Sequence, residues 1–231
     1  MATSIRNGFI SPQVWVEKRE TKVIEILGRL SPARVEYAEN IFGGEKYMQG
    51  NTPKRDYSIV TLALSNGKGK SRKTAKYNFN PDNFFALRRE CEPAINYQRS
   101  YVKEYKKRNC VNGKITERSI TIRFEYYRKK NGQFDLDSRG QKQISNYPWY
   151  IGISERTGEA DAQGTKIVKE LSKVQEYILL TSDEYQSMLD STCRYIDCFA
   201  MAFGPTLLRE KVKLSEAKRE AGNSRGRNSS L

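Results

Sequence analysis

The sequence predicts an α+β protein with two β-β-β-β-α units, in which each antiparallel sheet packs against its own C-terminal helix. Two observations support this prediction. A strand-to-helix junction at residues 77–87 has a counterpart at 178–188, in which Asp82 aligns with Asp183 and Phe84 with Tyr185. Strand-forming sequence rich in β-branched residues precedes both junctions. A repeated supersecondary unit indicates a duplicated architecture.

The first unit begins with residues 13–30, whose β-branched content predicts one or two strands. Residues 35–42 are a further strand candidate, and residues 43–53 form a turn-rich loop. Apolar alternation predicts a strand at 56–65, and residues 73–79 return from a glycine-containing turn. These last two strands therefore form a hairpin.

A helix follows the hairpin and has three concordant start signals. Asn80 is the N-cap residue, Pro81 occupies the first helical position and Asp82 lies in the first turn. Pro93 should kink or end this helix, and a second helical segment is predicted over 94–107.

The second unit repeats the order of strands and then helix. Strands are predicted at 117–129 and 147–155, separated by a polar loop over 130–146, and two short strands at 166–180. The first of these alternates Ile120, Ile122, Phe124 and Tyr126 on one face, and the second alternates Trp149, Ile151 and Ile153.

Thr181 begins the second helix, and Glu184 three residues later completes a capping box. An apolar stripe beginning at Tyr185 predicts a face that is buried on the sheet, with a partner-binding face as the alternative. Gly204 and Pro205 are expected to end this helix.

Charge is distributed unevenly along the chain, whose formal net charge is +14. The predicted first unit, residues 1–110, and the predicted tail, residues 205–231, carry the excess of Lys and Arg, whereas the second unit, 111–204, is neutral. We expect the tail to be basic and largely flexible. A charge of this size attracts polyanions at long range, although a solvated surface or a structural protein with acidic neighbours is also consistent with it.

The composition argues against an enzyme. The chain has no histidine, which removes the commonest general base and the usual metal ligand. Its four cysteines, Cys91, Cys110, Cys193 and Cys198, form no C-x-x-C pair, and we expect Cys91 and Cys193 to be buried thiols. No cofactor, metal or catalytic residue is predicted. A nuclease hypothesis would depend on Asp135 and Asp137 alone.

No stretch of the sequence has the length and apolarity of a membrane span, and the first residues lack the apolar segment of a signal peptide. We therefore expect a cytosolic protein without membrane contact, in its own cell or in the host of a virus.

Basic and aromatic residues form the candidate binding surface. Five cations follow the turn near Gly67 without an acidic residue from Asn66 to Asn80, so they favour an external anion such as phosphate. A second group mixes rings and cations, which suits single strands whose bases stack on aromatic faces. The candidate nucleic-acid-binding residues are Lys68, Lys70, Arg72, Lys73, Lys76, Tyr57, Trp15, Tyr126, Tyr127, Arg128, Lys129 and Lys130.

The two junctions, Phe79–Leu87 and Leu180–Met188, resemble the Whirly fold and related transcriptional coactivators that bind single-stranded DNA. Each junction has a polar residue, then Pro or Ser and an acidic residue, then an aromatic and an aliphatic residue. The resemblance covers nearly the whole chain. It implies curved sheets, each packed against its helix, and two units joined through their helices.

The Gly-Lys-Gly-Lys segment at 67–70 is similar to the basic Lys-Gly-Lys stretch of a Whirly hairpin, which implies backbone contacts by Lys68 and Lys70. The second unit departs from the family pattern, because its hairpin region is neutral and carries Glu170 and Glu176.

These observations predict a non-enzymatic protein that binds single-stranded nucleic acid, DNA in preference to RNA, largely independently of sequence. Such a protein would be an accessory factor in replication, recombination or transcription, with a phage as one candidate source, and it could form homo-oligomers. The alternative is a structural or assembly protein, for example a virion component with a basic face.

Overall fold

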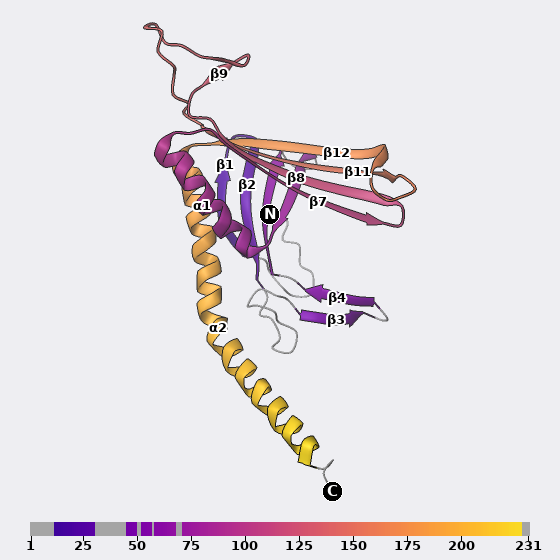
Figure 1. Ribbon diagram of the computed structural model, residues 1–231. Coiled ribbons are helices and arrows are strands. Elements are labelled where there is room, and N and C mark those ends of the chain that lie inside the picture. The colour runs from indigo at the N-terminus through magenta and orange to yellow at the C-terminus, as the bar shows by residue number, and fades with distance from the viewer. Residues whose placement is uncertain (1–11, 31–44, 50–51, 57, 68–70, 228–231) are drawn as a thin grey trace. The chain divides into compact units, whose positions relative to one another are not determined.

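The computed structural model describes residues 12–30, 45–49, 52–56, 58–67 and 71–227, with side chains undescribed at 45–49, 52–56 and 218–227. It is an α+β structure with two four-stranded antiparallel sheets and a long C-terminal helix (Figure 1). The predicted α+β class is thus confirmed. Residues 1–28 and 60–193 form one compact unit, and residues 29–59 and 194–231 form another.

The first sheet has the order β1-β2-β5-β6. Its strands are β1 (Gln13–Lys18), β2 (Lys22–Arg29), β5 (Ile59–Asn66) and β6 (Lys73–Phe79), as the sequence predicts. The loop expected over 43–53 is wrong, because β3 (Glu45–Gln49) and β4 (Thr52–Asp56) pair in a small separate sheet. The strand predicted at 35–42 lies outside the described residues.

Helix α1 (Pro81–Tyr97) begins where predicted, after Asn80 and with Pro at its first position. It continues through Pro93 and ends at Gln98, whose φ of 54° is left-handed. The predicted helix over 94–107 is therefore wrong beyond Tyr97. Instead β7 (Tyr101–Val111) begins the second sheet, because its alternating exposed and half-buried residues suit an edge strand.

The second sheet has the order β12-β11-β8-β7. It is completed by β8 (Lys114–Phe124), β11 (Trp149–Ala160) and β12 (Ile167–Leu180), the last of which is one strand rather than the predicted two. The polar loop between β8 and β11 contains the short pair β9 (Lys129–Lys130) and β10 (Gln133–Phe134).

Helix α2 (Ser182–Arg227) begins with the predicted capping box. The Glu184 amide donates to Thr181 Oγ1 at 3.2 Å, and the Thr181 amide donates to a Glu184 carboxylate oxygen at 2.9 Å. The predicted end at Gly204 and Pro205 is wrong, because α2 continues through Pro205 to Arg227. The good helix formers that follow Pro205, including Leu, Arg, Glu and Lys, favour this continuation.

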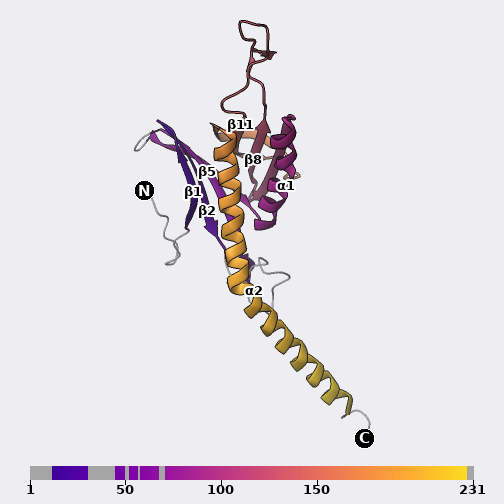
Figure 2. The ribbon, with the colours of Figure 1, turned by 90° about the vertical axis from the view of Figure 1, so that its left-hand side faces the viewer.

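Aromatic side chains join the two sheets and the two helices in the compact unit formed by 1–28 and 60–193. Phe79 of β6 packs edge-on against Phe84 of α1 at 4.9 Å and against Tyr105 of β7 at 5.4 Å between ring centroids. Tyr185 of α2 stacks on Trp149 of β11 at 3.7 Å, and its hydroxyl lies 3.2 Å from Cys91 Sγ. Helix α1 and the first turns of α2 thus lie side by side (Figure 2).

The order of elements repeats along the chain. For each four-stranded sheet, the chain forms two strands, then a short hairpin outside the sheet, then the other two strands and a helix. The junction residues aligned in the sequence also share an environment, since Phe84, Leu87, Tyr185 and Met188 are all fully buried. The division of the repeat at residue 110 stays a prediction.

Cys91 and Cys193 are buried as predicted, and burial raises the pKa of the Cys91 thiol to about 11. This thiol therefore stays protonated near neutral pH. Among the described residues, no helix combines the length and apolarity needed to cross a membrane.

Candidate nucleic-acid interface

The predicted site residues fall in three places. Lys68, Lys70 and Tyr57 lie outside the described residues. Arg72, Lys73 and Lys76 are exposed on β6 or just before it, whereas half-buried Trp15 lies on β1 at the opposite edge of the first sheet. The sheet order therefore separates Trp15 from the β6 cations. The remaining candidates follow β8 and are Tyr126, Tyr127, Arg128, Lys129 and Lys130.

The β6 strand exposes Lys76 and Thr74, as the alternation predicts. Lys73 and Lys76 are exposed, while Ala75, Tyr77 and Phe79 are buried. Neither lysine forms an ion pair within the described part of the chain. Lys76 thus places positive charge on the face opposite Tyr77 and Phe79, whereas Lys73 is exposed at the start of the strand.

The outer face of the second sheet carries two parallel aromatic rings. Trp149, Ile151 and Ile153 are buried, so the alternating residues of β11 point to the opposite face. There Tyr150 stacks with Tyr177 of β12 at 5.6 Å between ring centroids, with 19° between the ring planes. We call Tyr150, Gly152 and Tyr177 the tyrosine platform.

Gly152 allows the Tyr150 ring to lie flat on this face. A Cβ atom at Gly152 would lie 2.5 Å from Tyr150 Oη and 2.8 Å from Tyr150 Cε1, which is closer than van der Waals contact permits. Tyr177 lies directly opposite Gly152 in the register of β11 and β12. Because glycine has no side chain, the rings of Tyr150 and Tyr177 can occupy the space over Gly152.

Cations flank the tyrosine platform on both sides. Lys22, at the start of β2, places Nζ 3.6 Å from the Tyr177 ring centroid and donates to the Tyr177 carbonyl at 3.0 Å. Arg123 of β8 pairs with Tyr150 in the sheet register and places its guanidinium 4.9 Å from the Tyr150 centroid. The row of cation, ring, ring and cation thus combines stacking surface with positive charge.

Arg19 connects the turn between β1 and β2 to α2 through an ion pair with Glu184. Its guanidinium donates to both carboxylate oxygens of Glu184 at 2.6 Å and lies 5.6 Å from the Tyr147 ring centroid. Burial alone would raise the pKa of Glu184, but hydrogen bonds from Arg19 and Thr181 lower this pKa below its ordinary value. The ion pair therefore holds Lys22, three residues after Arg19, near Tyr177.

Residues 125–148 form an arm that projects from the end of the second sheet (Figure 1). Backbone hydrogen bonds close it, including those from Glu125 N to Pro148 O at 2.9 Å and from Ser145 N to Tyr126 O at 2.8 Å. The Tyr127 ring contacts the rings of Tyr126 and Phe134 edge-on, and Lys142 Nζ lies 4.1 Å from the Phe134 centroid. The arm thus combines exposed rings with cations.

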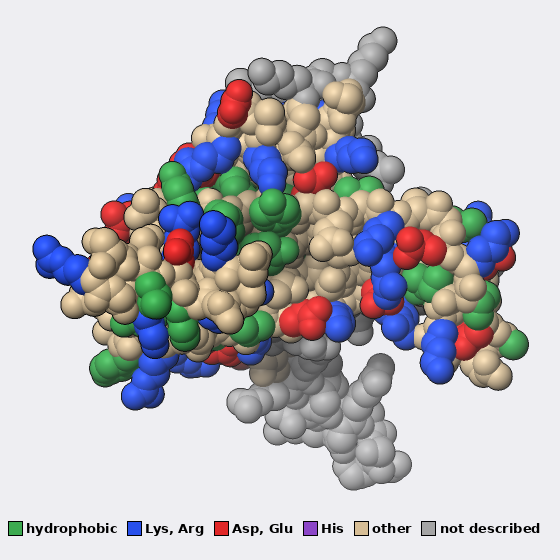
Figure 3. All heavy atoms as spheres, turned by 90° about the horizontal axis from the view of Figure 1, so that it is seen from above, with side chains coloured by type: hydrophobic (Ala, Val, Ile, Leu, Met, Phe, Trp, Pro, Cys, Tyr) green, Lys and Arg blue, Asp and Glu red, His purple; other side chains and the backbone are tan. Residues whose placement is uncertain are grey.

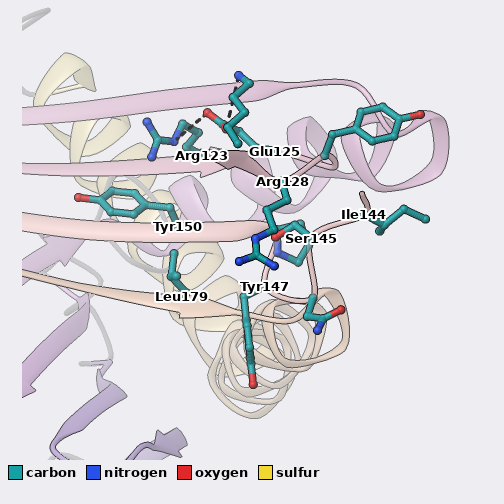
Figure 4. Close-up of a pocket in the computed structure, with 12 residues that line it drawn as sticks. Arg123, Glu125, Arg128, Ile144, Ser145, Tyr147, Tyr150 and Leu179 are labelled. Carbon is teal, nitrogen blue, oxygen red and sulfur yellow. Dashed lines mark ion pairs between the residues drawn. The ribbon is translucent and has the colours of Figure 1, made fainter. Parts of the chain in front are cut away.

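A pocket of about 320 Å³ lies where the arm meets the sheet (Figure 4). Arg123, Tyr150 and Leu179 come from neighbouring strands, and Arg128 extends from the arm toward Tyr147. This pocket brings the predicted residues Tyr127, Arg128 and Lys129 together with the edge of the tyrosine platform.

The pocket cations have partly exposed acidic partners. Glu125 pairs with Arg123 at 3.4 Å and Lys129 at 3.5 Å, and Arg128 pairs with Asp135 at 3.2 Å. Exposed ion pairs contribute only about 0–1 kcal/mol, so a phosphate can replace such partners at little cost. On the face in Figure 3, Lys and Arg side chains lie among acidic ones over much of the surface, and several gather at the lower left of the view.

The two aspartates considered for a nuclease have structural roles. Asp135 pairs with Arg128, and Asp137 Oδ1 accepts hydrogen bonds from the backbone amides of Arg139 and Gln141. No group of three or more potential metal ligands occurs in the part of the chain that the structure describes.

None of the tyrosine platform, Tyr150, Gly152 and Tyr177, was among the predicted site residues, and neither were its flanking cations Lys22 and Arg123. One signal was present, because an aromatic residue and a glycine occupy successive outward positions of a strand whose first three inward residues are large and apolar. The cross-strand partners of these residues come from other parts of the chain, which a single sequence does not pair. Comparison with protein-family models, curated proteins and solved structures finds no match to this chain.

Proposed function

We propose that this chain is a non-enzymatic protein that binds single-stranded nucleic acid through the tyrosine platform and its flanking cations. The observation that carries the proposal is the near-parallel pair of half-buried Tyr150 and exposed Tyr177, with Lys22 and Arg123 beside the rings. Unpaired bases stack on such rings, while cations contact the backbone phosphates.

The duplicated order of strands, inserted hairpin, strands and helix supports a two-unit Whirly-like arrangement. That likeness is our reason for favouring DNA over RNA. In this interpretation the second sheet supplies stacking, and the exposed lysines of β6 supply further phosphate contacts. Binding would be largely independent of sequence, as suits an accessory factor in replication, recombination or transcription.

An assembly protein is the second candidate. The exposed apolar side chains of the arm, Phe134, Leu136 and Ile144, favour it, because apolar surface of this kind also suits contact with another protein. This candidate predicts tight self-association and no preference for single over double strands.

Fluorescence anisotropy with a labelled unstructured oligonucleotide tests the proposal. We expect single-stranded DNA to bind more tightly than duplex, with log affinity falling by about 0.7 per phosphate contact for each tenfold rise in salt. Replacing Tyr150 with Leu should weaken binding by about 5- to 150-fold, since stacking contributes roughly 1–3 kcal/mol per base.

Tyr97→Leu is the matched control, because Tyr97 is an exposed ring beside a cation, Arg99, at the end of α1. This variant should bind like the unmodified protein. Affinity that is insensitive to salt, or equal losses in the two variants, would refute binding at the platform.

A further inference from the structure

The pocket at the root of the arm has room for one small ligand. Its volume of about 320 Å³ is at the lower end of the roughly 300–1,000 Å³ that small-molecule pockets occupy. The outer sheet face continues beyond it as an open surface that carries Tyr177. A polymer that lies on the open face could therefore place only a single unit in the pocket.

One wall of the pocket suits a flat aromatic ring. Tyr150 and Leu179 are direct partners in the register of β11 and β12, and both line the pocket. Leu179 is exposed although it is apolar, and the Tyr150 ring lies flat over Gly152. Together they offer an apolar floor on which a nucleobase can stack.

The cations that line the pocket suit a phosphate. Arg123, Arg128 and Lys129 line the pocket, and two carboxylates, Glu125 and Asp135, are their partners. Because Glu125 pairs with both Arg123 and Lys129, these three cations and two carboxylates keep one net positive charge. The planar guanidinium of Arg128, whose side chain is 62% exposed, matches the geometry of phosphate oxygens.

Polar groups occupy a third side. Ser145 and Asn146 line the pocket, and their side chains have no hydrogen-bond partner among the described residues. An amide offers both donors and an acceptor, and a hydroxyl offers either, so these groups can pair with the edge of a base.

We propose that this pocket holds one nucleotide of the bound strand and selects its base. The base stacks on Tyr150 and Leu179, its phosphate lies at Arg128, and its edge meets Ser145 and Asn146. This inference rests on the proposed function and deepens it, because binding along the open face is independent of sequence while one position in the strand is selective.

Two measurements test the pocket. Oligonucleotides that differ in the base at a single position should differ in affinity, and nucleoside 5′-monophosphates should compete with a short oligonucleotide. We expect Asn146→Ala to reduce the base preference by about 2- to 10-fold, the net contribution of one hydrogen bond. Arg128→Gln should weaken every oligonucleotide and abolish competition by the monophosphates.

Asn109→Ala and Arg139→Gln are matched controls, because Asn109 and Arg139 are exposed residues that do not line the pocket. Both should behave like the unmodified protein. If oligonucleotides bind in a Tyr150-dependent manner but the pocket variants match these controls, the nucleotide pocket is refuted and the proposed function stands. If no oligonucleotide binds, both the nucleotide pocket and the proposed function are refuted.

Discussion

The two four-stranded sheets share their order of elements but differ in the surface they present. Both sheets have an inserted hairpin after their second strand and a helix after their fourth. The first sheet exposes Lys73 and Lys76 on β6, without a ring between them. The second carries half-buried Tyr150 and exposed Tyr177, with a cation beside each ring. Under the proposed function, the two sheets would therefore make different contacts, electrostatic on the first and by stacking on the second.

The largest expected effect concerns the buried aromatic residue in the first turns of each helix. Phe84 and Tyr185 occupy matched positions, and both are fully buried against their sheets. We expect Phe84→Ala and Tyr185→Ala each to lower the free energy of unfolding by about 3–5 kcal/mol, since each leaves a large cavity. Chemical denaturation measures both values.

Tyr97→Ala is the control for these two variants, because this side chain is 69% exposed and should change stability by less than about 0.5 kcal/mol. If either core variant were as mild as this control, the two junctions would not be equivalent.

The second prediction concerns the tyrosine platform on the second sheet. We expect Gly152→Ala to weaken binding of single strands by about 5- to 150-fold, because the added methyl group displaces the Tyr150 ring and its stacking. The clash is with the end of a side chain that can move away, so the free energy of unfolding should change by less than about 1 kcal/mol. Anisotropy and denaturation measured on the same variant separate the two effects.

The third prediction concerns the exposed lysines of β6 and the salt dependence of binding. In the double variant Lys73→Gln with Lys76→Gln, the dependence of log affinity on log salt should become shallower by about 1.4, or 0.7 for each lost phosphate contact. Gly152→Ala should leave that dependence unchanged. Identical salt dependences in the two variants would contradict a division between stacking on one sheet and charge on the other.

Local signals predicted the strands and helix starts better than the ends of elements. The alternation around Ile120 and Trp149, the proline after Asn80 and the capping box at Thr181 all depend on neighbours in the chain, and the structure confirms them. Pro93 was expected to kink or end α1 and Pro205 to end α2, yet both helices continue, because the helix-forming residues that follow outweigh one lost hydrogen bond.

The candidate site could be predicted only in part for a different reason. Arg128 and Tyr127 were found because rings and cations adjoin in the sequence. Lys22 and Tyr177 are 155 residues apart, and they meet only because sheet register and the turn at Arg19 bring them together. Long-range pairing of this kind has no local signature, so the tyrosine platform could not be predicted from the sequence.

The smallest expected effect compares the two helix starts. Within the described residues, the Asn80 side chain makes no capping hydrogen bond at α1, whereas Thr181 and Glu184 form a reciprocal pair at α2. We therefore expect Thr181→Ala to lower the free energy of unfolding by about 1 kcal/mol and Asn80→Ala by less than about 0.5 kcal/mol. Denaturation of both variants under one condition gives the comparison, and equal losses would contradict it.

The pH dependence of Glu184→Gln isolates the charge at the α2 start. The pKa of Glu184 is lowered in the folded protein, so its carboxylate stabilises the fold above its ordinary pKa of 4.5, and this contribution disappears as the pH falls through the lowered value. Gln can still accept the Thr181 amide but cannot pair with Arg19 as an anion. The variant should therefore be less stable by up to about 1 kcal/mol at pH 7 and equal to the unmodified protein at the acid end. A difference that persisted unchanged in acid would mean that shape, rather than charge, holds Arg19 beside the tyrosine platform.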